Sequence, residues 1–402
     1  MEKTKVELGL VLMFLFCFFG EILTFPDTWI LIGESAICAA LYARQNKIRV
    51  DIPTCLLAIT VILYIGMDKS FGIASITPLT YVIPLIFMMM NYLAAEIKKS
   101  STDDNLIILL ILVMTIGLTF HGLLNSYMWL DKQWLNGVFR IWKDFWSGEY
   151  KYAAWQNSYY LPAMALVLPA IIYFKKRKII NGFIILSACF FLYISLISES
   201  RVTALMFPLV LVIQSVVYVV LEKNQLTKNI NKKFFVIGIV LGGLVLIGAG
   251  IIFLNSSVGQ GFLEIMGRDG GIFNNVRFKF QRKALGQIFK YPFGGRKMDF
   301  MGYGHAHNAW IDIADAGGVI PFFTFVNYTI YTMFDLGCIL KKREVTTELK
   351  LMVIGVYIVF ALFFMIESAL ESYGRYILPW IFMHGLVHGY VANANSENAD
   401  VE

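Results

Sequence analysis

Residues Arg277 to Trp310 read R-F-K-F-Q-R-K-A-L-G-Q-I-F-K-Y-P-F-G-G-R-K-M-D-F-M-G-Y-G-H-A-H-N-A-W and form a long polar interruption in a very apolar chain. Within it, positions 278–289 alternate apolar and basic residues at a spacing that predicts a helix with one apolar and one cationic face. Pro292 and the pair Gly294–Gly295 are expected to end this helix.

The apolar runs on both sides of this stretch indicate a membrane protein. The chain is 58% hydrophobic and 15% charged, whereas soluble proteins are about 45–50% apolar and about 25% charged. Runs of about 20 apolar residues recur, and each is long enough to cross a hydrocarbon core of about 30 Å. Because each segment must satisfy its own backbone hydrogen bonds in lipid, the sequence predicts an all-α integral membrane protein.

We expect about 12 transmembrane helices. They cover residues 8–25, 28–43, 53–67, 75–95, 105–125, 158–174, 179–197, 202–221, 234–254, 318–339, 351–369 and 375–392. The expected division is N-terminal helices 1–125, an external aromatic loop 126–157, helices 158–254, an external basic loop 255–317 with its amphipathic helix, helices 318–392 and a tail 393–402.

The distribution of Lys and Arg sets the expected orientation. The segments on one side carry basic clusters such as Lys175–Lys178 and Lys341–Arg343, whereas the short loops on the other side carry only Lys69, Arg201 and Arg375. By the positive-inside rule, both termini lie in the cytoplasm. The two long loops, and any site within them, therefore face outward.

The external aromatic loop interleaves aromatic and charged residues, as at Trp142, Lys143 and Trp146. This pattern suits a helix lying in the headgroup layer. Such a loop either anchors the protein as an aromatic belt or stacks against sugar rings, and we favour the belt.

Several cations are candidates for binding an anionic substrate. Arg201 lies between two apolar runs, where it either reaches the interface, pairs with Glu199 or faces a cavity as a fixed cation. Arg277 offers the planar fork that suits phosphate. Arg268 and Arg282 are further basic residues of the same loop.

His307 precedes Asn308 at the entrance to the expected span 318–339. A histidine there can take a proton from a sugar hydroxyl, or it can be satisfied by local backbone groups. His305 is two residues away, so in an extended strand the two rings would point to opposite sides. We predict no metal, because no H-x-x-x-H or C-x-x-C pattern supports a zinc site.

Four carboxylates flank the same region. Asp312 and Asp315 follow His307 by one to two turns, where they bind sugar or cap the helix. Glu367 and Glu371 are one turn apart, and they either pair with Arg375 or line a cavity. We predict no cofactor, because Gly302–Gly304 lacks the strand–helix context of a nucleotide fold.

The order of these features resembles the O-antigen ligase and polymerase family. The resemblance rests on Ser200–Arg201, Arg277, Ala284–Leu285, Ile288, Pro292–Gly294, His307–Asn308 and Gly317–Ile320. It covers residues 200–325. It depends on the order of the motifs and on their expected place on the same side of the membrane, rather than on any one motif.

The resemblance implies a metal-independent glycosyltransferase that uses sugar chains on a polyprenyl diphosphate carrier. Arg201 and Arg277 would bind the diphosphate, and His307 would activate the acceptor hydroxyl. The resemblance also implies that the protein lies in the bacterial cytoplasmic membrane. The process would be the synthesis of capsule, O-antigen or exopolysaccharide. A flippase and a chain-length regulator would be its partners. We expect contact with the lipid bilayer and no nucleic-acid partner.

Three functions remain open. A polymerase would join lipid-linked repeat units, and a ligase would transfer the finished glycan to lipid A core or to a protein. Both need the same donor site, and the lack of a separate acceptor domain in the sequence favours the polymerase. A flippase or transporter predicts cations along several spans and broken helices in both halves.

Overall fold

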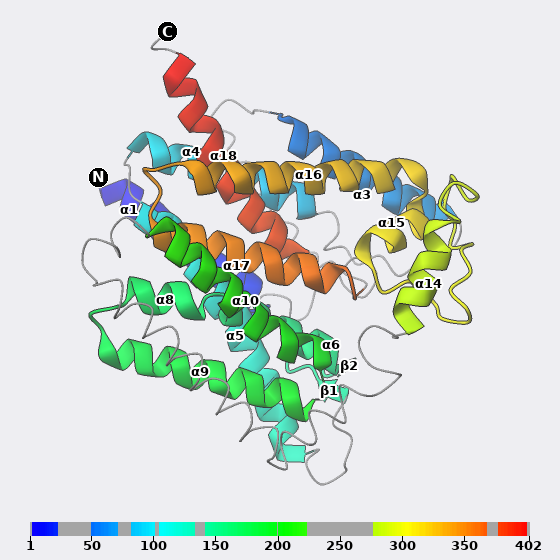
Figure 1. Ribbon diagram of the computed structural model, residues 1–402, viewed down its shortest axis with the longest axis horizontal. Helices are drawn as coiled ribbons and strands as arrows, with labels where there is room; N and C mark the ends of the chain where they lie inside the picture. Colours follow the sequence, from blue (N-terminus) through cyan, green and yellow to red (C-terminus); the bar gives the residue numbers. More distant parts are fainter. Residues whose placement is uncertain are drawn as a thin grey trace.

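Figure 1 shows a computed structural model of the chain, a bundle of helices. The structure describes residues 2–22, 50–70, 82–100, 104–132, 141–198, 200–222, 276–367 and 377–399, without the side chains of a few residues inside these ranges, Arg201 among them. The described residues are mainly helical, and the sheet found among them is a two-stranded hairpin.

The first half of the described chain contains α1 (Glu2–Phe19), α3 (Ile52–Ser70), α4 (Val82–Ser100), α5 (Asp104–Lys132), β1 (Ile141–Lys143), β2 (Tyr150–Tyr152), α6 (Ala153–Ser158), α7 (Leu161–Ala165), α8 (Val167–Tyr173), α9 (Lys178–Ile197) and α10 (Arg201–Leu221). The second half contains α14 (Val276–Leu285), α15 (Ala309–Gly317), α16 (Val319–Lys341), α17 (Thr347–Phe364) and α18 (Leu378–Ala399).

Four of the described helices are long and apolar enough to cross a membrane. They cover Asp104–Met128, Lys178–Ser195, Thr203–Leu221 and Thr347–Phe364, and shorter apolar helices occur at Ile52–Met67 and Val82–Ala95. In α9 and α10 large apolar side chains face outward, with Phe183 and Val220 each 67% exposed, as expected for a lipid-facing surface. The all-helical membrane class is therefore confirmed, whereas the count of about 12 spans is not. The expected spans 28–43 and 234–254 lie outside the described residues.

Within the expected single span 158–174, the helix is interrupted at Leu166, between α7 and α8. Pro162 lies in the first turn of α7 and Pro169 in the first turn of α8. Proline lacks an N–H and is tolerated in a first turn, where that donor has no helical partner. Pro169 lacks the N–H that a continuous helix would direct at the carbonyl of Ala165, so the interruption falls where that bond is lost.

The expected interfacial helix in the aromatic loop is wrong for residues 141–152, which form an antiparallel hairpin that pairs Ile141 with Tyr152. Asp144 builds the turn, because its Oδ1 accepts hydrogen bonds from the backbone N–H and the hydroxyl of Ser147 at 2.7 and 2.8 Å. Gly148 completes the turn at a φ of 70°, a conformation that favours glycine.

The core is densest where α18 packs against α4. An added Cβ at Gly385 would lie 2.6 Å from the carbonyl oxygen of Phe87, and one at Gly389 would lie 2.2 Å from that of Asn91. Two glycines four residues apart thus let the two helix backbones approach closely, as small residues do in membrane helix pairs. The neighbouring His384 and His388 belong to the same two turns of α18.

Figure 1 places α14, α15, the hairpin and α6 at one end of the bundle, on the right. The start of α10 lies at the same end, in contact with α6. The loops 174–178 and 341–347, which carry basic clusters, lie at the opposite end. The basic loops 174–178 and 341–347 thus lie at the end of the bundle opposite to α14 and the hairpin, as the distribution of Lys and Arg along the sequence predicts.

Candidate functional site

Residues 277–310 form the polar stretch of the sequence and are called the polar loop below. This loop is anchored where P-F-G-G at 292–295 packs against A-G-G-V at 316–319. The N–H of Val319 donates to the carbonyl of Pro292 at 2.9 Å, and the N–H of Gly295 donates to the carbonyl of Ala316 at 3.1 Å. A Cβ on Gly318 would lie 2.2 Å from the Pro292 oxygen. Only glycine leaves room for this crossing, which fixes the loop to the junction of α15 and α16.

A second set of contacts fixes the backbone around His307. Asn308 is the N-cap of α15, and its Oδ1 accepts from the N–H of Ile311 at 3.2 Å. Asp312 is buried, and its two carboxylate oxygens accept from the N–H groups of Ala306 at 2.7 Å and Asn308 at 3.0 Å. These bonds support a φ of 51° at His307, which is unusual for a residue other than glycine.

Helix α14 holds the same loop from the other side. The buried amide of Gln281 donates to the carbonyl oxygens of Ala306 and His307, each at 3.1 Å, and to that of Met365 at 3.2 Å. Phe280 and Ala284, on the same helix, are fully buried. One side chain of α14 therefore ties the histidine loop to the end of α17.

The carboxylate of Glu367, just beyond α17, joins two of the predicted site residues. Its Oε1 accepts from Nη1 of Arg277 at 2.9 Å, and its Oε2 lies 3.4 Å from Nδ1 of His307. Nη1 of Arg277 also donates to the carbonyl of Ile366 at 2.7 Å. Burial would raise the pKa of Glu367, but the hydrogen bond from His307 and the charge of Arg277 hold it below its usual value.

This site is open to solvent. The side chain of Arg277 is 31% exposed, that of His307 22% and that of Glu367 15%. A substrate can therefore reach the arginine and the histidine, while the carboxylate lies beneath both.

The two loop histidines contact each other, contrary to the expectation that they point to opposite sides. The ring centroids of His305 and His307 are 4.2 Å apart. The positive φ at His307 turns the backbone, so the alternation of an extended strand does not apply. Burial first, and then the positive charges of His307, Arg277 and Arg296 against the opposing charge of Glu367, lower the pKa of His305 to about 4.

The structure thus brings together Arg277, His307, Asn308 and Glu367, with Asp312 beneath the loop. Asp315 accepts from the N–H of Met298 at 2.9 Å, so it also supports the loop. Arg282 is exposed on α14. Arg201 is the first residue of α10, but its side chain is outside the described part of the structure, as are Arg268 and Glu371 entirely.

Sequence reasoning missed two buried groups of histidines and carboxylates. In the first, His121 lies between Glu21 at 3.3 Å and Asp144 at 2.8 Å. Burial would raise the pKa of Asp144, but the hydrogen bond and charge of His121 hold it far below its usual value. This group ties the hairpin to the middle of α5 and to the turn that follows α1.

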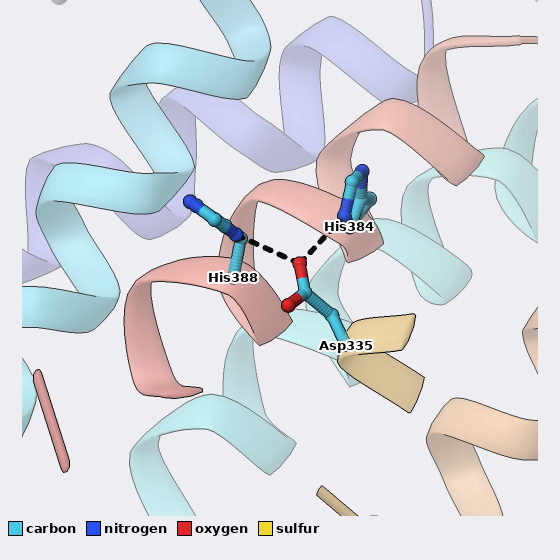
Figure 2. Close-up of side chains that lie close together, drawn as sticks. All are labelled: Asp335, His384 and His388. Carbon is cyan, nitrogen blue, oxygen red and sulfur yellow. Dashed lines mark hydrogen bonds and ion pairs between the residues drawn. The ribbon is translucent and has the colours of Figure 1, made fainter. Parts of the chain in front are cut away.

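In the second group, shown in Figure 2, Asp335 lies between His384 and His388. The signal for it was present in the sequence, because H-G-L-V-H at 384–388 is an H-x-x-x-H pattern. The expectation that no H-x-x-x-H pattern supports a zinc site is therefore wrong for this part of the chain.

The chain matches no protein-family model, and no curated protein matches it.

Proposed function

We propose that the chain is a polysaccharide polymerase that joins polyprenyl-diphosphate-linked repeat units at the outer face of the cytoplasmic membrane. The observation that carries this proposal is the bridge from Glu367 to both Arg277 and His307. It brings a phosphate-binding cation and a base together, although Arg277 and Glu367 are 90 residues apart in sequence.

Oε2 of Glu367 lies 3.4 Å from Nδ1 of His307, and in the proposed reaction the carboxylate favours the tautomer with its hydrogen on Nδ1, which leaves Nε2 as the base. Nε2 takes the proton of the acceptor hydroxyl, and the hydroxyl oxygen attacks the anomeric carbon of the donor sugar. The bond from that carbon to the diphosphate oxygen breaks, and the diphosphate leaves with the electron pair. Attack on the face opposite the leaving group inverts the anomeric configuration.

The role of Arg277 follows from where charge develops. Diphosphate is a good leaving group, so the site needs fixed cations for the growing negative charge rather than a strong general acid. The guanidinium of Arg277 is partly exposed beside His307, and its fork suits phosphate oxygens. We assign Arg201 the same task and Asn308 contact with the substrate. The buried Asp312 positions the histidine loop, since both its oxygens hold loop N–H groups.

One observation favours a second candidate, a flippase for the lipid-linked oligosaccharide. The break between α7 and α8, within residues 158–174, is the kind of interruption that transporters place at a substrate site. The described cations of the polar loop, however, gather at one end of the bundle, where a transfer enzyme would need them.

Deletion of the gene in its own host, followed by sizing of the surface glycan on a gel, separates these functions. Single repeat units at the surface would support the polymerase. Full-length polymer left on the lipid carrier would instead assign a ligase. Repeat units trapped on the inner leaflet would assign a flippase and remove the proposed role of His307.

A further inference from the structure

The group around Asp335 lies within helices rather than in the polar loop. Asp335 is on α16, and His384 and His388 are one turn apart on α18. Oδ2 of Asp335 lies 2.9 Å from Nε2 of His384 and 2.7 Å from Nδ1 of His388, so three potential ligand atoms converge (Figure 2). His384 is fully buried and Asp335 is 4% exposed.

The outer nitrogen of His384 has a partner of its own. Nδ1 lies 3.2 Å from the hydroxyl of Thr332, and that hydroxyl donates its one hydrogen to the carbonyl of Tyr328 at 3.0 Å. The hydroxyl oxygen is then an acceptor for an N–H at Nδ1. Nε2 of His384 is in hydrogen-bond contact with Oδ2 of Asp335 at 2.9 Å, and the tautomer decides which of the two ring nitrogens carries the hydrogen.

The outer nitrogen of His388 has a carboxylate partner. Nε2 lies 3.3 Å from Oδ2 of Asp51. Asp51 is itself held in place, because Oδ1 accepts from the backbone N–H of Thr54 at 3.0 Å and Oδ2 accepts from the amide of Asn91 at 2.5 Å. His388 therefore lies between two carboxylates, with Nδ1 2.7 Å from Oδ2 of Asp335 and Nε2 3.3 Å from Oδ2 of Asp51.

Two imidazole nitrogens and one carboxylate oxygen converge at the centre of this group, and each imidazole nitrogen can present either an N–H or a lone pair there. The two carboxylates, Asp335 and Asp51, carry two negative charges among helices, where uncompensated charge is costly. A divalent cation held by the three side chains would balance both charges, and protons on the imidazoles are the alternative.

We propose that Asp335, His384 and His388 form a binding site for a divalent transition-metal ion of the zinc class. Nitrogen and oxygen donors of this kind suit zinc, and an H-x-x-x-H pair on a helix directs two imidazoles to one side. Histidine ligands of metals commonly donate their other N–H to a carboxylate or another oxygen, and the outer nitrogens of His388 and His384 have such an oxygen at 3.3 and 3.2 Å.

The distances between the three ligand atoms are slightly shorter than in an occupied zinc site, as expected if the side chains move together when no ion is bound. Ligand atoms at about 2.1 Å from a tetrahedral zinc are about 3.4 Å apart, and the observed contacts to Asp335 are 2.9 and 2.7 Å. Opening by roughly half an ångström admits the ion. Water or the second oxygen of Asp335 can take the fourth position. His388 is 16% and Asp51 23% exposed, so an entry path exists on that side.

Such an ion would join α16 to α18, and through Asp51 and Asn91 to α3 and α4. It lies apart from the loop site and takes no part in the proposed transfer. Its role is structural, because it neutralises buried charge and fixes the packing of four helices.

The test is metal binding by the purified full-length protein in detergent. To exclude thiol binding, all five cysteines are changed to serine, since Cys55 and Cys189 are exposed. After treatment with a chelator and dialysis against zinc, we expect about one zinc ion per chain by elemental analysis. Substitution with cobalt(II) should give visible d–d absorption without a thiolate charge-transfer band.

Variants locate the site. Asp335→Asn and His388→Gln keep the side-chain shape and should abolish stoichiometric zinc, and chelation should no longer lower their melting temperature. Asp51→Asn should weaken zinc binding by about 10- to 100-fold, as for other partners of metal-bound histidines. His121→Gln is the matched control, a buried histidine between two carboxylates, and should leave zinc binding unchanged.

Two results would overturn the proposal. The first is a folded parent protein, judged by its chromatographic profile, that holds neither zinc nor cobalt; the two charges would then be balanced by protons. The second is loss of zinc in His121→Gln with retention in Asp335→Asn or His388→Gln. Because the folded parent protein alone can overturn the proposal, a site variant that fails to fold does not prevent a decision.

Discussion

The loop site at Glu367 and the helix group at Asp335 use the same chemical groups in different settings. In each, one carboxylate lies beside two basic side chains, Arg277 and His307 in the first case and His384 and His388 in the second. The loop groups are 15 to 31% exposed, whereas Asp335 and His384 are at most 4% exposed. Because both groups contain the same kinds of residue, their exposure to substrate is what makes the Glu367 site a candidate for catalysis and the Asp335 group a candidate for a structural role.

The scaffold differs as well. His307 is held on a loop at a φ of 51° by hydrogen bonds from several elements. His384 and His388 lie on a regular helix and owe their positions to its spacing. Changes at the loop site should therefore affect transfer with little effect on folding, and changes in the helix group should do the reverse.

The largest effect is expected from His307→Asn. Asparagine tolerates the left-handed conformation at this position, so the substitution removes the base without straining the loop. Loss of a general base costs about 10²- to 10⁴-fold in rate. The measurement is glycan transfer by purified protein, with the melting temperature as control. Near wild-type transfer would remove His307 from the mechanism.

Glu367→Gln should lower transfer by about tenfold or more. A hydrogen bond to a charged group is worth about 1.5–3 kcal/mol, and about 1.4 kcal/mol is a factor of ten in rate. Because the glutamine no longer favours the Nδ1–H tautomer of His307, the pH profile of transfer should also move. A variant with the rate and profile of the wild type would show that Glu367 does not act through the histidine.

Asp312→Asn should mainly affect stability. In asparagine an NH₂ group replaces one of the two carboxylate oxygens, so one of the two loop N–H groups loses its acceptor. A buried polar group without a partner costs about 1–3 kcal/mol. Asp299→Asn is the matched control, because Asp299 is exposed and pairs with the exposed Lys283. Equal melting temperatures for the two variants would contradict the supporting role of Asp312.

The smallest effect is a pH dependence from His305. Its pKa is about 4 in the folded protein against 6.5 as the ordinary value. Between these values the unfolded chain binds a proton that the folded loop excludes, so stability falls as the pH is lowered from 6.5 toward 4. His305→Asn should reduce this fall in melting temperature. An unchanged fall would assign it to other groups.

The sequence predicted the helical membrane class because lipid allows few other structures for long apolar runs. It also placed Arg277, His307 and Asn308 in one polar loop. It did not predict that Glu367 bridges Arg277 and His307, because that contact joins segments far apart in the chain. The hairpin was missed although Asp144 and Gly148 are turn residues, since the aromatic residues around them were given more weight.

The contact between His305 and His307 depends on a single backbone angle that local spacing does not reveal. Asp335 was missed for a different reason. It lies inside an apolar run, and its partners on α18 are 49 and 53 residues away. Only the H-x-x-x-H spacing of His384 and His388 could have pointed to it.

The most direct test of the central claim uses purified protein in vesicles with a polyprenyl-diphosphate-linked repeat unit. The wild type should form a ladder of longer glycans and release polyprenyl diphosphate, whereas Arg277→Ala and His307→Asn should form neither while remaining folded. The account is contradicted if the wild type gives no ladder, or if both variants give the wild-type ladder.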